Sequence, residues 1–438
     1  MPYAGVPFST QLGNPLSFTY HLYNLIILFD YYLYTGDLSY VENKWDQYKL
    51  ALAFSLSFID ESGMQNVTSS ADWLRFGMGG HNIEANSILY FTINQAVYLA
   101  SEVNEANQTL VDSWQSAAAG IKAAANRLLW NETAGLYHDN ETTTLMPQDG
   151  NCWAVISNLT DSAEKNVAIS NGLAARWTDF GAPAPEADNA VSPFISGFEL
   201  EAHFIAGSAS TALALVRLEW GFMINDPRMT NSTFIEGYQA DGVLHYAPYT
   251  NDPRVSHAHG WATGPTSHLT EYFAGIRILT QAGETWEIAP ALGGLTSVDA
   301  GYSTNLGLFA NQVNATEDGA ITGMTFTTPS GTTGTVRLPG VSGTLTSNNG
   351  TTVQLSGGIA SDVAGGSWTL NVQSSTAVNG TATGGNSTYG VGSNGSGTVS
   401  SPSATGSQPA QYTGNSATMA TVSSGLLALA AGVFAFLL

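Results

Sequence analysis

The apolar positions in roughly the first 280 residues recur at helical spacing, and the helices that they predict come in pairs. Residues 17–37, "SFTYHLYNLIILFDYYLYTGD", are apolar nearly all round, whereas residues 38–59 keep a polar face. The same alternation recurs twice, in 82–104 with 108–130 and in 192–207 with 208–225. A helix that is apolar on every side must be covered on every side, while an amphipathic helix can face solvent. The pattern therefore predicts inner and outer layers of helices, as in an (α/α)6 toroid.

The number of predicted helices is smaller than such a toroid requires. Eight or nine helical segments can be read between residues 17 and 280, whereas a closed toroid of six hairpins needs twelve. We therefore expect a mainly α domain over residues 1–281, with a toroid that is incomplete.

From residue 282 the pattern changes to short β-rich runs separated by Gly, Asn and Asp turns, such as "GAITGMTFTTPSG" and "GSWTLNVQ". This pattern predicts a C-terminal antiparallel β-sandwich over residues 282–372. Residues 373–414 are rich in Ser, Thr, Gly and Asn and carry no charge. Because such a segment cannot bury a core, we expect it to form an extended stalk.

Residues 415–438 have the layout of a lipid-attachment signal. The last fourteen residues, "GLLALAAGVFAFLL", are apolar, but a bilayer-spanning helix needs about 20. A polar spacer and the small residues "GNSA" precede them, which is the pattern of a GPI-attachment signal processed near Gly414 or Asn415. We therefore expect a protein anchored at the cell surface. The alternative is a disordered hydrophobic tail, which a soluble protein rarely tolerates.

Composition narrows the partners and the compartment. With 12 Lys and Arg against 34 Asp and Glu, a formal charge of −22, the chain lacks the clustered cations that nucleic acid requires. Its single cysteine, Cys152, excludes disulfides and cysteine-based metal sites, and its apolar neighbours predict a buried, inert thiol.

Eleven Asn-x-Ser/Thr sequons favour the secretory pathway. They begin at Asn66, Asn107, Asn131, Asn140, Asn158, Asn231, Asn314, Asn349, Asn379, Asn386 and Asn394. The N-terminal stretch "MPYAGVPFSTQLGNP" nevertheless contains no signal peptide. Either the sequons are unused or the chain lacks its true N-terminus.

No phosphate-binding loop, dinucleotide fingerprint, zinc-protease motif or nucleophile elbow occurs in the sequence. We therefore look to the loops that follow the inner helices, where a toroid opens its cavity. These segments combine aromatic rings with carboxylates, amides and histidines: Asp72, Trp73, Gln148, Asp149, Trp153, Glu199, His257, His259 and Trp261. Aromatic faces stack on the C–H faces of sugars, and polar groups pair with their hydroxyls. Each residue alone has a structural interpretation, such as a helix cap for Asp72, but their grouping favours a glycan site.

Six segments then occur in a familiar order: "MPYAGVPF", "YYLYTGD", "ADWLRFGMGG", "MPQDGNCWAV", "SPFISGFELEAHF" and "STFIEGY…HGWATGPTSHLTEY". Together they resemble the fungal α-L-rhamnosidases of glycoside hydrolase family 78, in the six-hairpin glycosidase superfamily. The resemblance runs from residue 1 to about residue 310. It implies that residues 1–281 are a partial catalytic domain acting on carbohydrate, without a cofactor or a metal.

The resemblance also implies roles for individual residues. The glutamate of the segment matching "STFIEGY" is the family's general base, so Glu236 would activate a water molecule for attack with inversion. The apolar residues Phe234 and Ile235 beside it suit this role, because partial desolvation raises the basicity of a carboxylate. The positions that match the rhamnose subsite or its rim are Asp72, Trp73, Trp153, His259 and Trp261.

One expected part is missing from the sequence. The family's general acid lies in a Trp-Gly-Asp-containing loop upstream of the segment matching "MPYAG". The absent loop, the absent signal peptide and the small number of helices all suggest an N-terminally truncated chain. We expect such a chain to hydrolyse rhamnosides poorly.

The expected function is thus removal of terminal α-L-rhamnosyl groups by a GPI-anchored cell-surface glycosidase. One rival is a non-catalytic cell-surface protein that only binds glycans. Another is a different (α/α)6 enzyme, either a second type of glycosidase or a polysaccharide lyase. A lyase needs a basic groove for uronates, which the charge of −22 opposes.

Overall fold

The computed structural model describes residues 16–376, except positions 71, 248 and 250. Contacts divide the chain into two units, Met1–Gly390 and Val391–Leu438, and the features described below all belong to the first. The predicted attachment signal, and all but the first four residues of the predicted stalk, lie outside the described residues.

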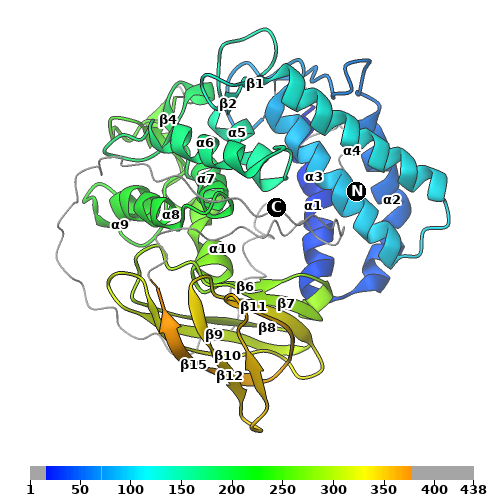
Figure 1. Cartoon of the computed structure of the whole chain (residues 1–438). Coiled ribbons are helices and arrows are strands. Elements are labelled where there is room, and N and C mark those ends of the chain that lie inside the picture. Colours follow the sequence, from blue (N-terminus) through cyan, green and yellow to red (C-terminus); the bar gives the residue numbers. More distant parts are fainter. Residues whose placement is uncertain (1–15, 71, 248, 250, 377–438) are drawn as a thin grey trace. The chain divides into compact units, whose positions relative to one another are not determined.

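Helices form the first two thirds of the described chain (Figure 1). The α-helices are α1 (Phe18–Thr35), α2 (Leu38–Leu56), α3 (Ile83–Glu102), α4 (Gln108–Leu128), α5 (Gln148–Ile156), α6 (Ala163–Ala174), α7 (Pro193–Ile205), α8 (Ala209–Leu215), α9 (Gly221–Asn225) and α10 (Pro265–His268). Short 3-10 segments are η2 (Pro185–Ala187), η4 (Asp252–Arg254), η5 (Gly260–Thr263) and η7 (Gln281–Gly283), and π-helical turns are η3 (Val216–Trp220) and η6 (Leu269–Phe273).

The helices pack as the alternating pattern predicts. Helices α1, α3, α5 and α7 contact one another in sequence, and each also contacts the helix that follows it. Most residues of α3 are buried, whereas α4 buries one stripe that includes Trp114 and Ile121. The described residues therefore form a row of inner helices with outer partners. Closure of this row into a toroid remains a prediction.

Local capping signals explain where the first hairpin begins and turns. The Ser17 hydroxyl accepts a hydrogen bond from the backbone N–H of Tyr20 and so caps α1. At the other end Gly36 adopts a left-handed conformation (φ +68°), and its N–H donates to the carbonyl of Tyr32. The Asp37 side chain then caps α2 through the N–H of Tyr40. The tight connection makes α1 and α2 antiparallel neighbours.

Two sheets follow the helices, and small strands lie among the helices. The strands within the helical part are β1 (Trp130–Asn131), β2 (Leu136–Tyr137), β3 (Pro183–Ala184), β4 (Ala190–Val191) and β5 (Tyr238–Gln239). Those of the two sheets are β6 (Ile276–Ile278), β7 (Thr285–Ile288), β8 (Ser297–Thr304), β9 (Gly307–Ala315), β10 (Ile321–Thr327), β11 (Thr333–Arg337), β12 (Val341–Ser347), β13 (Thr352–Gln354), β14 (Ile359–Ala364) and β15 (Ser367–Ser375). The strand orders are β13-β12-β15-β10-β9-β8 and β14-β11-β7-β6.

The sheet region differs from the expected antiparallel sandwich in two ways. It begins at β6, six residues before residue 282, because the short apolar run "GIRI" pairs with β7. In addition, β7 pairs in parallel with β11. The strands between them, β8 to β10, belong to the other sheet, so the chain re-enters the small sheet in the same direction. Alternation along each strand predicts burial but cannot reveal this crossover.

Among the described residues, no helix has the length and apolar character needed to cross a membrane. The apolar segment of the predicted attachment signal, residues 425–438, lies outside the described residues.

Candidate active site

Two inner helices bring acidic side chains towards the loop that carries Asp72 and Trp73. Glu84 lies in the first turn of α3, and Asp149 lies in the first turn of α5. Helix N-termini favour negative side chains because their first N–H groups are unpaired and carry partial positive charge. Oxygen atoms of Asp72, Glu84 and Asp149 lie within 4.8 Å of one another. The fold thus concentrates negative charge at this end of the inner helices.

A buried arginine lies among these carboxylates. Arg75 is only 4% exposed, and its Nη1 atom lies 2.9 Å from Asp149 Oδ2 and 3.6 Å from Glu84 Oε2. Its Nη2 atom lies 2.5 Å from Asp139 Oδ1. The planar guanidinium suits such a site because it can donate to several carboxylates at once. Arg75 therefore ties the Asp72 loop to α3, to α5 and to Asp139 in the turn after β2.

One guanidinium does not balance all of these carboxyls. Burial raises the pKa of Asp72, whose Oδ1 accepts a hydrogen bond from Thr19. Burial and the nearby charges of Asp149 and Asp72 raise the pKa of Glu84. The three carboxylates could ligate a cation, but Arg75 already lies against two of them and protonation can relieve the rest. We assign no metal to this group.

Two of the three predicted tryptophans lie in this region but are buried. Trp73 is 1% exposed, and its indole N–H donates to Asp149 Oδ2 at 3.0 Å. Trp153, on α5, is 4% exposed and packs against the rings of Tyr23 and Phe198. Both therefore shape the site from within, and direct stacking of either ring on a sugar remains a prediction.

Glu199 lies in the middle of α7 and has several hydrogen-bond partners. Its Oε2 accepts from Gln148 Nε2 at 2.6 Å, and its Oε1 accepts from Trp177 Nε1 at 2.6 Å. His203, one turn later, pairs with Oε1 at 3.2 Å. Burial raises the pKa of Glu199, but the contacts with His203, Gln148 and Trp177 outweigh it, so the pKa is lowered overall. Glu199 is thus a buried, ionised anchor for Gln148.

Glu236 lies in a separate loop and is 3% exposed. Its Oε1 accepts a hydrogen bond from the Tyr249 hydroxyl at 2.5 Å, and its Oε2 accepts from the Ser256 N–H at 2.9 Å. His259 Nδ1 lies 3.7 Å from Oε2, and burial lowers the pKa of His259 despite the nearby carboxylate. The segment is also fixed through its backbone, because the Glu236 carbonyl accepts from Trp261 Nε1 at 2.8 Å. The carboxylate is therefore held in one position by groups from the 249–261 segment.

The glycine after Glu236 is required by packing. A Cβ atom at Gly237 would lie 2.6 Å from Cε2 of the buried Tyr246 ring. Burial raises the pKa of Tyr246, and the nearby charges of Glu236 and Glu186 raise it further. Burial likewise raises the pKa of Tyr20 on α1, and Asp72, Glu84 and Tyr246 add to this increase. These couplings indicate that Glu236 and the acidic group around Asp72 belong to one region.

A chain of aromatic contacts joins the same two parts. Trp261 stacks on Phe194 with ring centroids 5.3 Å apart, and Phe194 lies 6.3 Å from Tyr23. Tyr23 is 5.9 Å from Trp153. His259 also lies against Trp261, at 4.4 Å. The aromatic chain therefore links Trp153, His259 and Trp261, and Glu236 joins it through the hydrogen bond from Trp261.

The sequence reading placed some of these residues in the wrong kind of element. Gln148, Asp149 and Trp153 lie on α5, whereas we expected a loop there. Glu199 lies inside α7, within the helix predicted over residues 192–207. Helix α5 contains Asp, Gly and Asn, which have low helix propensity, so its sequence did not suggest a helix. Burial of almost the whole segment stabilises it instead.

Several contributors were not predicted, namely Arg75, Glu84, Glu186 and Tyr249. Arg75 could have been found from composition, because an arginine within "ADWLRFGMGG" is one of only 12 basic residues in the chain. No pattern in the sequence indicates that Tyr249 and Glu186 lie near the other site residues, and only the folded structure shows it. Two minor expectations can also be placed. His257 is half-buried and its carbonyl accepts from Thr233 Oγ1, while the pKa of the fully buried Cys152 thiol is raised by its burial, as expected of an inert thiol.

Two carboxyls outside the site, the buried Glu219 and the half-buried Asp30, predict how stability depends on pH. Burial raises the pKa of Glu219 to about 8 and, together with Glu271, raises that of Asp30 to about 7. Because the folded-state pKa exceeds the unfolded value of about 4, the folded protein binds extra protons in this window. The melting temperature should therefore fall as pH rises from 5 to 8. Scanning calorimetry of wild type and Glu219→Gln measures this, with a shallower slope expected for the variant. A melting temperature that increases over this range would contradict the assignment.

The comparisons with known proteins give a consistent fold. The sequence matches no protein-family model and no curated protein. Among solved structures, the chain is similar to the GH78 family rhamnosidase of Bacillus sp. GL1, with a TM-score of 0.57 and 20% identity over 69% of this chain and 31% of that one. It is also similar to the α-L-rhamnosidase of Dictyoglumus thermophilum (TM-score 0.60, 16% identity, 78% and 38% covered) and to that of Aspergillus terreus (0.55, 15%, 76% and 37%). The chain spans about a third of the length of each of these structures. Its described part has a rhamnosidase-like fold.

Proposed function

We propose that this protein is a glycoside hydrolase that removes terminal α-L-rhamnosyl groups with inversion, using Glu236 as general base. The observation that carries the proposal is the setting of Glu236. It is a buried carboxylate fixed by Tyr249 and Ser256 beside the aromatic pair Phe194 and Trp261, on a rhamnosidase-like fold. The resemblance of "STFIEGY" to the family's base segment supports the same residue.

The geometry suits a base that acts on water. A carboxylate oxygen has two lone pairs, so Oε1 and Oε2 each keep one after accepting from Tyr249 and Ser256. One of these can accept a proton from a water molecule that attacks the anomeric carbon. Since the incoming water and the leaving group occupy opposite faces, the product has inverted configuration.

Departure of the aglycone needs a second carboxyl, placed about 6.5–9.5 Å from the base in inverting enzymes. We assign this general acid to none of the residues between 16 and 376. The resemblance instead suggests a loop encoded ahead of the segment matching "MPYAG". We therefore propose the activity for the protein encoded by the longest open reading frame that contains this chain.

A screen of nitrophenyl glycosides tests the substrate class. We expect release of nitrophenol from the α-L-rhamnoside and little release from the α-L-fucoside, β-D-glucoside or α-D-mannoside. If all four remain intact while the protein still binds rhamnose, the non-catalytic glycan-binding alternative replaces the hydrolase proposal.

The hydrogen bond from Tyr249 gives a prediction specific to the base. Tyr249→Phe removes the hydroxyl donor that fixes Glu236 Oε1 in place. Because a catalytic base must be held towards the water that it activates, kcat should fall by up to about 10²-fold. As a control, Tyr238→Phe removes a hydroxyl that donates to the Phe180 carbonyl, and its kcat should match that of wild type. An unchanged kcat for Tyr249→Phe would argue against Glu236 as the base.

We also propose that the mature protein is held at the cell surface by a lipid. The support is the C-terminal pattern of small residues, spacer and apolar tail together with the sequons. Phospholipase C should release the protein from membranes, and mass spectrometry should find no residues from 425–438. Detection of that apolar segment in the mature protein would contradict the anchor.

A further inference from the structure

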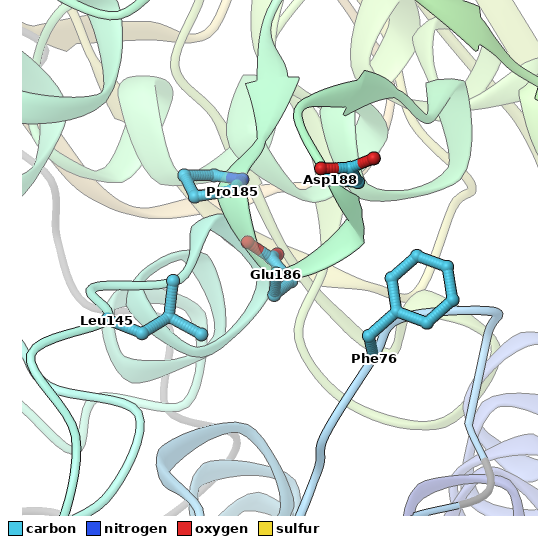
Figure 2. A pocket seen from close by; sticks show the side chains of 5 residues that line it. All are labelled: Phe76, Leu145, Pro185, Glu186 and Asp188. Atoms are coloured by element: carbon cyan, nitrogen blue, oxygen red, sulfur yellow. The ribbon is translucent and has the colours of Figure 1, made fainter. Parts of the chain in front are cut away.

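A hollow lies over the N-terminus of α5, beside the Asp149 and Arg75 contacts. It has a volume of about 360 Å³, and Figure 2 shows the five side chains that line it, namely Phe76, Leu145, Pro185, Glu186 and Asp188. This volume is near the lower end of the range for small-molecule sites, about 300–1,000 Å³. The hollow is therefore large enough for a single sugar ring.

Hydrogen bonds of Phe76 and Glu186 hold two of the lining residues in place. The Phe76 N–H donates to the Glu186 carbonyl at 2.8 Å, which joins the Asp72 loop to η2. The Glu186 carboxylate accepts from the N–H groups of Gln148 and Asp149, both at 2.9 Å. Since Asp149 also contacts Trp73, the hollow is connected to the candidate active site through a few rigid contacts.

Unfavourable backbone conformations border the hollow on both sides. Leu74, two residues before Phe76, has φ +83°, and Asp188 and Asn189 have φ +57° and +58°. A left-handed conformation is particularly costly for a residue as bulky as leucine. Such conformations concentrate at binding and catalytic sites, where the surrounding structure maintains them. Here they accompany a Phe76 side chain that is 50% exposed and an exposed Asp188.

We propose that this hollow is a carbohydrate subsite for a neutral sugar unit next to the terminal rhamnose. The Phe76 ring would stack on the C–H face of that sugar, and the Asp188 carboxylate would accept its hydroxyls. The lining residues include the exposed Asp188 carboxylate and no cation, and the chain carries a charge of −22, so a uronate or phosphate is disfavoured. The inference rests on the proposed function and adds to it the class of the neighbouring unit.

Binding measurements test the subsite separately from catalysis. Isothermal titration calorimetry is performed in a Glu236→Gln background, so that hydrolysis does not interfere. The probes are methyl α-L-rhamnoside, α-L-rhamnosyl-β-D-glucose and the same disaccharide with glucuronic acid in place of glucose. We expect the glucose disaccharide to bind more tightly than either of the other two.

Two variants test which lining residues provide the additional affinity for the glucose disaccharide. Phe76→Ala should weaken binding of the glucose disaccharide about fivefold, the effect of losing one aromatic contact. Asp188→Asn should reduce the ratio between the dissociation constants of the glucuronic acid disaccharide and the glucose disaccharide. The matched control is Leu50→Ala on α2, which removes another exposed apolar side chain (71%) far along the chain and should change nothing.

The outcomes distinguish this inference from the proposed function. If Phe76→Ala weakens disaccharide binding but the wild type hydrolyses no rhamnoside, the subsite is supported and the hydrolase proposal fails. If the wild type hydrolyses rhamnosides while glucose adds no affinity, or Phe76→Ala and Asp188→Asn leave every dissociation constant unchanged, the subsite proposal is overturned.

Discussion

Replacing Glu236 by glutamine should lower kcat for an α-L-rhamnoside by roughly 10²–10⁴-fold while the protein stays folded. Glutamine keeps the size of the side chain and can still accept from Tyr249 or Ser256, but it cannot take a proton from water. Circular dichroism and the melting temperature should therefore remain close to those of wild type.

Two further variants show whether the loss is chemical. Glu236→Ala leaves space for an added anion, so azide should restore part of the turnover and give the rhamnosyl azide of inverted configuration. As a matched control, Glu141→Gln changes an exposed carboxylate that pairs with His81 outside the candidate site, and it should leave kcat unchanged. Near-normal activity of Glu236→Gln would assign the base to another residue, with Glu199 the next candidate.

Replacing Arg75 by methionine should lower the free energy of unfolding by about 3–5 kcal/mol. The substitution leaves the buried carboxylates of Asp149, Asp139 and Glu84 without their guanidinium partner. Urea denaturation followed by tryptophan fluorescence measures the change. Because Trp73 and Asp149 share this network, rhamnose binding should weaken as well.

The same measurement on two other variants separates burial from simple loss of charge. Arg228 pairs with Asp226 at the surface and is 49% exposed in its side chain, so Arg228→Met should cost only about 0–1 kcal/mol. Adding Asp149→Asn to Arg75→Met should restore part of the lost stability, since one unpaired charge is removed. Equal effects of Arg75→Met and Arg228→Met would show that the buried network contributes little.

Sequence pattern predicted the helical part better than the sheets, for physical reasons. Segment 17–37 is apolar all round because its helix is buried on both faces, whereas segment 108–130 is amphipathic because its helix is buried on one face. Each pattern can be read within its own segment of the sequence. The parallel pairing of β7 with β11 depends on which sheet receives the intervening strands, and alternation within a strand does not encode that choice. The short helix α5 escaped prediction because tertiary burial stabilises residues of low helix propensity.

The candidate site shows the same division. Glu236 could be singled out because a lone charge beside Phe234 and Ile235 has no local explanation. Its partners Tyr249 and Ser256 come from a segment 13 to 20 residues away and could not be paired with it from spacing. For Arg75, the only signal in the sequence is its rarity as one of 12 basic residues. Only the fold shows that this one is buried among carboxylates.

The most direct measurement of the central claim follows the anomeric configuration of the product. Proton NMR during the first minutes of hydrolysis of an aryl α-L-rhamnoside distinguishes newly released α- and β-rhamnose before they equilibrate. With protein from the longest open reading frame containing this chain, the account predicts that β-L-rhamnose appears first and that Glu236→Gln abolishes its release. Initial release of α-L-rhamnose, undiminished release by Glu236→Gln, or no release of rhamnose at all would contradict it.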